Sequence, residues 1–276
     1  MQVMATKGYL PDSTMPAKIK ARLDPVVSFT TVEKAFKKKA SPKAQDGNDY
    51  DIPNEPPVYD QGDIGSCVLN STCGAANIVL AVEGSSVDML SRLFLYWQCR
   101  LQMGTTTQDS GTYTHLAVDR VGNIGVCEEK VWAYGDSNLY NSPTPDTYPE
   151  ASDNKFTAWF NIDALAPSGG TSRLDQLETA IRSNHPVIYG SPVSSAIQNY
   201  QEGQILTIPS ANDIIGGHST CFTGVHYIDG ARVWRIRNSW GAAYGDNGHF
   251  LIDDAWAGWV QLNDLWVLTR MPDLEF

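Results

Sequence analysis

The chain has 276 residues, of which 42% are hydrophobic and 18% charged, and its formal net charge is −11 at pH 7. This composition is typical of a globular protein, and the length suits one or two subdomains with a full core. No apolar run approaches the ~20 residues of a membrane-spanning helix, and the acidic balance disfavours phosphate binding. We therefore expect neither a membrane nor a nucleic acid as a partner.

The first 45 residues differ in charge from the remainder. They contain nine Lys or Arg and three Asp or Glu, whereas residues 46–276 contain 11 Lys or Arg and 28 Asp or Glu. A basic arm ahead of an acidic body favours intramolecular docking, although a solvated, disordered tail is an equally good interpretation. We expect residues 1–45 to form a basic N-terminal arm with one short helix at residues 32–36. This arm would act as a short propeptide or lid.

The start of the chain also bears on its cellular location. Residues 1–16 include Lys7, Pro11 and Asp12 but no apolar stretch of the kind found in a signal peptide. We therefore expect a cytoplasmic protein, or one exported by a route without a visible signal peptide.

Residues 67–83 show apolar side chains near helical spacing, with Ser66 as a helix cap and Gly84 as a stop. Cys67 therefore opens a helix, where unpaired N–H groups lower the pKa of a thiol, and a histidine partner lowers it further. Gln61 lies in a glycine-rich turn just before this helix, so its side-chain amide and the Cys67 N–H form a pair of oxyanion donors. Taken alone, Cys67 is better explained as a small core residue.

The middle of the chain continues with helical patterns. Helices are predicted at residues 91–103 and 112–121, and Gly122 and Gly125 end this part. Residues 138–153 are rich in Pro, Asn, Ser and Tyr and indicate a long crossing loop. The sequence thus predicts a mainly helical half at about residues 54–150.

The last part of the chain favours strands. A helix at residues 174–183 precedes a buried strand at 186–190, and strands and turns follow as far as residue 268. We therefore expect a mainly sheet half at about residues 151–276, and a single domain at residues 46–276 with a cleft between its halves.

A hairpin in the sheet half carries His218 and Asn238 near one open end, around the turn residues Asp229 and Gly230. A regular two-residue turn would place Asn238 opposite Cys221, on the other face from His218. A bulge or a longer loop restores the match, so we predict an irregular register. Asn238 can then accept a hydrogen bond from one ring nitrogen of His218 while the other nitrogen faces Cys67.

These residues make the chain resemble the papain-like cysteine peptidases, particularly their bacterial members. The resemblance covers roughly residue 53 to the C-terminus, and His218 follows Cys67 by 151 residues, close to the ~130–150 typical of the family. Several motifs in the right order are more specific than any one of them. The motifs are the segment from Gln61 to Cys67, Asp109-Ser110-Gly111, Gly217-His218, Asn238-Ser239-Trp240 and the glycine-rich run at 244–250.

The resemblance implies an α+β, papain-like two-subdomain fold and a cysteine endopeptidase that acts on peptides or proteins through a thioester. In that family the catalytic groups match Cys67, His218, Asn238 and Gln61. The resemblance further implies that the remaining motif residues bind substrate or line the cleft, with the tryptophan shielding the bond between His218 and Asn238. These four residues are Ser110, Gly111, Gly217 and Trp240.

Three positions depart from the family pattern. Ile64 stands where many relatives have a disulfide cysteine, Val68 where they have an aromatic residue, and Ser110 where they have a second glycine. None of these changes touches the catalytic groups, but they leave the substrate preference open. Two other functions also remain open, namely a transpeptidase or ligase using the same thioester, and an inactive binding protein with the peptidase fold.

Five cysteines, an odd and low number for this length, argue against a disulfide scaffold. Cys99 and Cys127 could pair, but free thiols are favoured. His218 and His226 are too far apart along one strand to share a metal with Cys221. We expect no metal and no cofactor.

Overall fold

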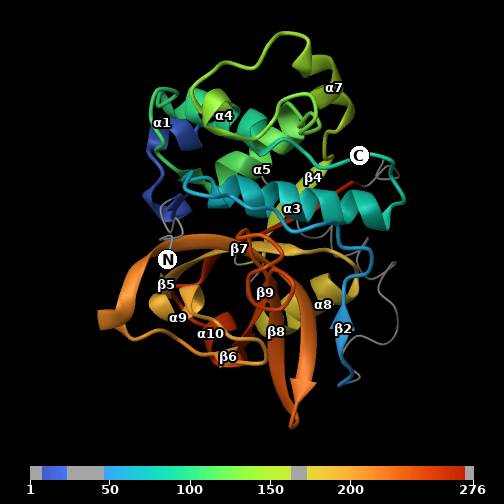
Figure 1. Cartoon of the computed structure of the whole chain (residues 1–276), viewed down its shortest axis with the longest axis vertical. Coiled ribbons are helices and arrows are strands. Elements are labelled where there is room, and N and C mark those ends of the chain that lie inside the picture. Colours follow the sequence, from blue (N-terminus) through green and yellow to red (C-terminus); the bar gives the residue numbers. More distant parts are fainter. Residues whose placement is uncertain (1–7, 24–46, 163–172, 271–276) are drawn as a thin grey trace.

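The computed structural model describes residues 8–23, 47–162 and 173–270. Within them the chain forms an α+β fold in which a group of helices lies above a large, mostly antiparallel sheet (Figure 1). The helix predicted at residues 32–36 lies outside the described residues. No helix in the described ranges is long and apolar enough to cross a membrane.

The helical half surrounds the long helix that begins at Cys67. Its apolar side chains, including Leu69 and Val79, pack with residues of the next helices into one buried core. Gly84, which has a φ of +73°, follows the end of the long helix, as predicted. The main helices are α3 (Cys67–Val82), α4 (Arg92–Met103) and α5 (Thr114–Asn123).

The segment predicted as a long crossing loop contains two short helices, α6 (Asp136–Leu139) and α7 (Thr147–Asp153). The turn residues of this segment do not prevent helix formation. Pro149 lies in the first turn of α7, where a backbone N–H has no partner within the helix and its loss costs little. The prediction of a continuous loop was therefore wrong.

The strands of the sheet half follow the order β4-β10-β5-β7-β8-β9-β6. Outside this order, β2 (Tyr50–Asp51) pairs with β7. Neighbouring strands are antiparallel except for β6 and β9, which are parallel. A second apolar core, which includes Trp234 and Phe250, lies within this half. The strands are β4 (Ala158–Asn161), β5 (Val187–Ser194), β6 (Ile205–Leu206), β7 (Ile214–Ile228), β8 (Ala231–Arg237), β9 (His249–Asp253) and β10 (Asn263–Thr269).

Three short helices accompany the sheet. They are α8 (Arg173–Arg182), which precedes β5, α9 (Ser195–Gln198), which follows it, and α10 (Asp254–Ala257), which follows β9. Figure 1 shows them in the lower part of the molecule, on the sheet side of α3. The sheet half therefore has its own helical cover, separate from the helices around Cys67.

The β7–β8 hairpin has the irregular register that the sequence predicts. Its two-residue turn is regular, because Ile228 pairs with Ala231 and both turn residues have positive φ. The register then shifts between Phe222 and Gly224, so that Cys221 lies opposite Arg237. This bulge brings the residue after Arg237 onto the same face as His218.

The N-terminal segment 8–23 lies on the body of the protein. Its strand β1 (Tyr9–Leu10) pairs in parallel with β3 (Thr112–Tyr113), and the Thr112 N–H donates to the Gly8 carbonyl at 2.9 Å. Beyond it, α1 (Ala17–Lys20) lies beside the helical half (Figure 1), with Ile19 buried in that core. This part of the basic arm is therefore docked rather than a solvated tail.

Candidate active site

Cys67 is the first residue of α3 and is 0% exposed. Ser66 occupies the predicted capping position, but its side chain makes no capping hydrogen bond to the helix. The Ser66 hydroxyl instead contacts the hydroxyl of Tyr134 at 2.6 Å, and Tyr134 donates to the Gln61 carbonyl at 2.8 Å. Asn70 donates to Ser66 from one turn further along the helix. This network holds the turn before Cys67 against the helix.

Gln61 is buried and its side-chain amide is oriented by two neighbours. The Ser239 hydroxyl donates to Gln61 Oε1 at 2.6 Å, and Gln61 Nε2 donates to the Ile64 carbonyl at 3.1 Å. Because Oε1 is the acceptor, the NH₂ end of the amide lies toward the turn that leads to Cys67. The Gln61 N–H also donates to the Ser239 carbonyl, which joins the two motifs directly.

His218 is 1% exposed and is held by Asn238 and Trp240. Its Nε2 lies 2.8 Å from Asn238 Oδ1, and the Trp240 ring stacks on it with centroids 5.0 Å apart. Since an amide oxygen only accepts, Nε2 carries the proton and Nδ1 presents a lone pair. Nδ1 has no hydrogen-bond partner within the described residues. Trp240 thus lies against the imidazole ring of His218, two residues from Asn238.

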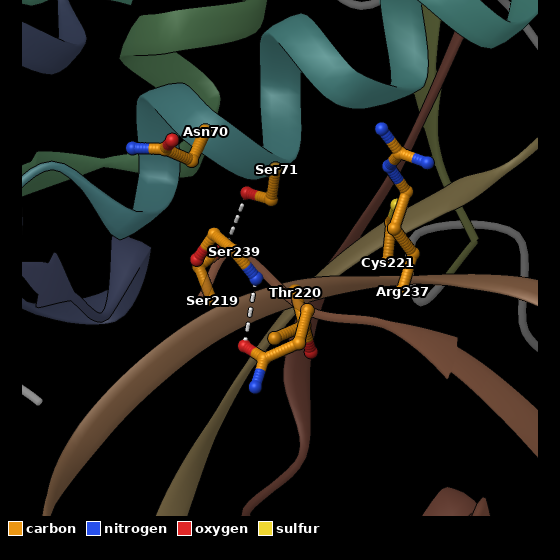
Figure 2. A pocket seen from close by; sticks show the side chains of 8 residues that line it. Asn70, Ser71, Ser219, Thr220, Cys221, Arg237 and Ser239 are labelled. Carbon is orange, nitrogen blue, oxygen red and sulfur yellow. Dashed lines mark hydrogen bonds between the residues drawn. The ribbon is translucent and has the colours of Figure 1, made fainter. Parts of the chain in front are cut away.

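The two halves of the site meet where α3 packs on β7. The Cys67 thiol lies within hydrogen-bond reach of the N–H of Ser219, the residue after His218. Next to it, the hydroxyls of Ser71 and Ser219 lie 2.7 Å apart, and Figure 2 shows this bond between the helix and the strand. The small hollow behind them leaves no space for a water molecule. Its lining residues are Asn70, Ser71, Ser219, Thr220, Cys221, Arg237, Asn238 and Ser239.

Burial decides the protonation of the thiol and the imidazole. It raises the pKa of Cys67 to about 12, against the opposing effect of the N–H groups of Ser219, Val68 and Cys67 itself. It also lowers the pKa of His218 to about 4. The expectation of a lowered thiol pKa at the helix start was therefore wrong for this state, because the loss of water outweighs the helix N–H groups. Both groups are neutral here.

The arm covers Cys67 with its backbone. A Cβ atom added to Gly8 would lie 3.0 Å from Cys67 Sγ and 2.5 Å from the Gly65 carbonyl oxygen. On the other side, a Cβ on Gly111 would lie 2.5 Å from the Gly8 carbonyl oxygen. Gly8 therefore fits between the turn before Cys67 and the backbone at Gly111, where a larger residue would collide with the backbone.

Tyr9 enters the sheet half beside His218. Its ring packs against Gly190 and Gly217, and its hydroxyl donates to Asp264 Oδ2 at 2.6 Å. The Asp12 N–H donates to the same oxygen at 2.9 Å. Sequence reasoning placed Gly217 at the cleft but missed the other members of this cluster, because no motif marks them and they come from opposite ends of the chain.

Asp109, Ser110 and Gly111 lie beside the turn before Cys67. Asp109 accepts from the Gly65 N–H at 2.8 Å and from the Tyr96 hydroxyl at 2.7 Å, and that hydroxyl accepts from the Gly111 N–H. The Ser110 hydroxyl bonds locally, with its oxygen 2.8 Å from that of Thr105. The positioning role of Tyr96 was also missed, since an interior helix tyrosine carries no distinctive sequence signal.

The five cysteines are all buried and free, as favoured from the sequence. In the part of the chain that the structure describes, no group of three His, Cys, Asp or Glu side chains gathers in the manner of a metal site.

A model of the papain family of cysteine proteases matches residues 42–267. The chain belongs to this family. It is accordingly a cysteine peptidase, and therefore a hydrolase. The matched range includes all the motif residues described above.

Two relatives illustrate the range of the family. The chain is 28% identical over 227 residues to an uncharacterized peptidase C1-like protein of Acanthamoeba polyphaga mimivirus, and the match covers 80% of this chain and 72% of that protein. It is 24% identical over 226 residues to the cathepsin B-like cysteine proteinase 5 of Caenorhabditis elegans, covering 71% of this chain and 64% of the relative. The chain thus spans less than two thirds of the nematode protein.

Solved structures confirm the papain-like two-subdomain fold. Xylellain, a cysteine protease from Xylella fastidiosa, superimposes with a TM-score of 0.75 at 26% identity, covering 98% of both chains. This neighbour agrees with the expected bacterial type. The procathepsin B of Trypanosoma congolense has a TM-score of 0.67 at 17% identity, covering 96% of this chain and 86% of that one, and so shares the fold.

Proposed function

We propose that the protein is an endopeptidase that hydrolyses peptide bonds through a thioester on Cys67. The thiol attacks the peptide carbonyl as it gives its proton to His218, and His218 then passes that proton to the leaving amine. His218 next removes a proton from water, which attacks the thioester and releases the acid and the free thiol. Asn238 keeps the imidazole oriented through both steps.

The observation that carries this proposal is the bond between His218 Nε2 and Asn238 Oδ1 at 2.8 Å. It assigns the proton to Nε2 and so leaves the Nδ1 lone pair to act as a base. The Cys67 thiol lies within hydrogen-bond reach of the backbone N–H of Ser219, the residue that follows His218. The thiol and a suitable base therefore come from the two halves that meet at this point.

Gln61 and the Cys67 N–H supply the oxyanion donors in this proposal. Ser239 holds Gln61 Oε1 at 2.6 Å and thereby directs the NH₂ end toward the turn at Cys67. A donor that is oriented before the reaction needs no reorganisation when charge develops on the substrate oxygen. Ser110 and Gly111 hold the substrate backbone along the strand edge that Gly8 and Tyr9 occupy in this state.

We also propose that residues 8–23 keep the enzyme latent. Gly8 occupies the space over Cys67, and enclosure by the arm contributes to the burial that keeps the thiol and the imidazole neutral. Departure of the arm admits water, which favours the charged forms of both groups and allows the thiolate to form. The basic arm is thus a propeptide or lid for the site.

A thiol-directed epoxide probe and a peptide library test this function. The wild type should be labelled at Cys67 and should cleave peptides to free acids, and Cys67→Ala should lose both activities. Cys73→Ala is the matched control, since Cys73 is a buried thiol in the same helix. Deletion of residues 1–45 should raise both rates. Peptide ligation without hydrolysis, or labelling that survives Cys67→Ala, would contradict the proposal.

A further inference from the structure

Arg92 is a buried charged side chain beside the turn that carries Gln61. It is 5% exposed and is the first residue of α4. Its Nε and Nη2 donate to the two carboxylate oxygens of Glu129, at 3.0 and 2.5 Å. A buried ion pair adds little net stability, because taking both charges out of water costs about as much as their attraction gains. What distinguishes this arginine is its remaining nitrogen, Nη1.

Nη1 holds the peptide group that precedes Gln61. It donates to the Asp60 carbonyl oxygen at 2.8 Å. The N–H of the same peptide group, which belongs to Gln61, donates to the Ser239 carbonyl at 2.9 Å. Arg92 comes from the helical half, whereas Ser239 follows β8 in the sheet half. The plane of this peptide is therefore held from both sides, and with it the direction in which the Gln61 side chain leaves the backbone.

The same nitrogen reaches the second oxyanion donor through Asn70. Nη1 donates to Asn70 Oδ1 at 2.9 Å. The amide of Asn70 is thereby turned so that Nδ2 donates to the Ser66 carbonyl oxygen, also at 2.9 Å. The Ser66 carbonyl and the Cys67 N–H belong to one peptide group, so this bond helps to set the direction of the N–H. One nitrogen of Arg92 is thus linked to the peptide groups of both donors.

Two tyrosine rings hold the guanidinium group of Arg92. Its Cζ lies 3.6 Å from the centre of the Tyr134 ring and 4.2 Å from that of Tyr59. The Tyr134 hydroxyl in turn donates to the Gln61 carbonyl at 2.8 Å. A planar guanidinium can stack on rings and donate from its edge at the same time, which a lysine ammonium cannot do. The site therefore requires arginine and not merely a positive charge.

We propose that Arg92 is a positioning residue for the reaction and sets the two oxyanion donors, the Gln61 amide and the Cys67 N–H, relative to each other. The inference rests on the proposed peptidase function and adds a residue that acts only through its neighbours. Oxyanion donors work when they are in place before the charge develops, and a misplacement of about 1 Å costs about 100-fold in rate. Arg92 should therefore affect the steps that create an oxyanion, and not the reactivity of the thiol.

The full-length Arg92→Lys variant tests this role. For each protein, kcat/KM on a fluorogenic peptide is divided by the second-order rate constant for modification of Cys67 by dipyridyl disulfide, followed by mass spectrometry. Disulfide exchange requires the thiolate but creates no oxyanion. The ratio therefore cancels differences in arm opening and in the thiolate fraction. In Arg92→Lys it should fall about tenfold or more.

Arg182→Lys is the matched control. The Arg182 side chain is 8% exposed, against 6% for Arg92, and its Nε donates to Glu178 at 2.8 Å. It also lies over the Tyr50 ring and donates to a backbone carbonyl, that of Asn48, but it belongs to α8. Both variants should lower the free energy of unfolding in chemical denaturation. Only Arg92→Lys should lower the ratio.

Tyr134→Phe is a second variant, which keeps the test decisive if Arg92→Lys does not fold. It retains the ring beside the guanidinium but removes the hydroxyl that donates to the Gln61 carbonyl. No buried charge loses its partner, and the ratio should fall by less than in Arg92→Lys. In both variants the loss should appear in kcat more than in KM, because the oxyanion develops only after the substrate has bound.

The outcomes separate the positioning role from the proposed function. An unchanged ratio in Arg92→Lys, or an equal fall in Arg182→Lys, would overturn the positioning role while the peptidase function stands. If Arg92→Lys does not fold, an unchanged ratio in Tyr134→Phe has the same consequence. A wild type that reacts with the disulfide at Cys67 but cleaves no peptide would instead contradict the peptidase function itself.

Discussion

The backbone N–H of Asp12 donates to Asp264 Oδ2 at 2.9 Å, which places two carboxyl groups from opposite ends of the chain side by side. The Asp12 carboxyl also accepts from Trp266 Nε1 at 2.8 Å and from the His115 N–H at 3.1 Å. This cluster fastens the arm to both halves of the molecule, because His115 lies in α5 and Asp264 in β10.

The pair should make arm docking depend on pH. Burial and the neighbouring Asp264 charge raise the pKa of Asp12 from 3.8 to about 7, and burial also raises the pKa of Asp264. The docked arm therefore holds a proton that the free arm releases. The free energy that the raised pKa contributes to docking is fully present below about pH 4. It is lost as the pH rises through about 7.

The other ionisable groups around the pair do not reverse this direction. Lys20 favours the charged form of Asp12, but by less than burial and Asp264 oppose it. Burial lowers the pKa of His115 to about 4, against the opposing effect of the nearby Asp119. The His115 ring is therefore neutral at pH values above about 4. The pKa of Tyr9 is raised, so its hydroxyl stays a donor.

The measurement is the rate of epoxide labelling at Cys67 from pH 5 to pH 8, divided by the same rate in Asp12→Asn. The ratio cancels the intrinsic pH dependence of the thiol. It should rise about tenfold or more over this range, as expected for a pKa shift of more than one unit. A constant ratio would show that the carboxyl pair does not control docking.

Gly8→Ala should release the arm. The added Cβ would lie 2.5 Å from the Gly65 oxygen, a backbone atom that cannot move aside cheaply. Overpacking of this kind costs about 1–3 kcal/mol, so labelling of Cys67 should become about tenfold faster. Ser13→Ala is the control, because Ser13 belongs to the same arm and is exposed. An unchanged rate in Gly8→Ala would mean that the arm does not limit access.

Gln61→Ala should lower kcat while leaving KM nearly constant. The loss of one oxyanion donor typically reduces kcat by about 10²–10³-fold. Ser239→Ala removes the bond that orients Gln61 Oε1 but leaves the amide in place, and we expect a smaller decrease. Steady-state kinetics on one fluorogenic peptide would compare the two variants. A rise in KM with constant kcat in Gln61→Ala would assign Gln61 to substrate binding instead.

Tyr96→Phe should loosen the site without touching its reactive groups. The Tyr96 hydroxyl donates to Asp109 and accepts from the Gly111 N–H, so its loss leaves two enclosed groups short of a partner. The free energy of unfolding should fall by about 1–3 kcal/mol, and KM should rise more than kcat falls. Tyr140→Phe, at an exposed hydroxyl, is the control for chemical denaturation and kinetics. Equal stability of the two variants would argue against the positioning role.

Features that depend on near neighbours and on ordered motifs could be predicted from the amino-acid sequence alone. The helix that starts at Cys67 follows from apolar spacing, and the turn at Asp229 and Gly230 follows from residues that accept positive φ. An irregular register in the hairpin could be predicted because His218 and Asn238 must lie on one face, and the structure shows it as a bulge between Phe222 and Gly224. Local geometry and strand alternation suffice for these conclusions.

The surroundings of those residues depend on the packing of distant segments and could not be predicted. The neutral thiol of Cys67 depends on burial by segments far away in the sequence, so a helix start alone gave the wrong direction for its pKa. The meeting of Tyr9, Asp12 and Asp264 joins residues more than 250 positions apart. Such contacts depend on how whole elements pack, and no local pattern of side chains records that.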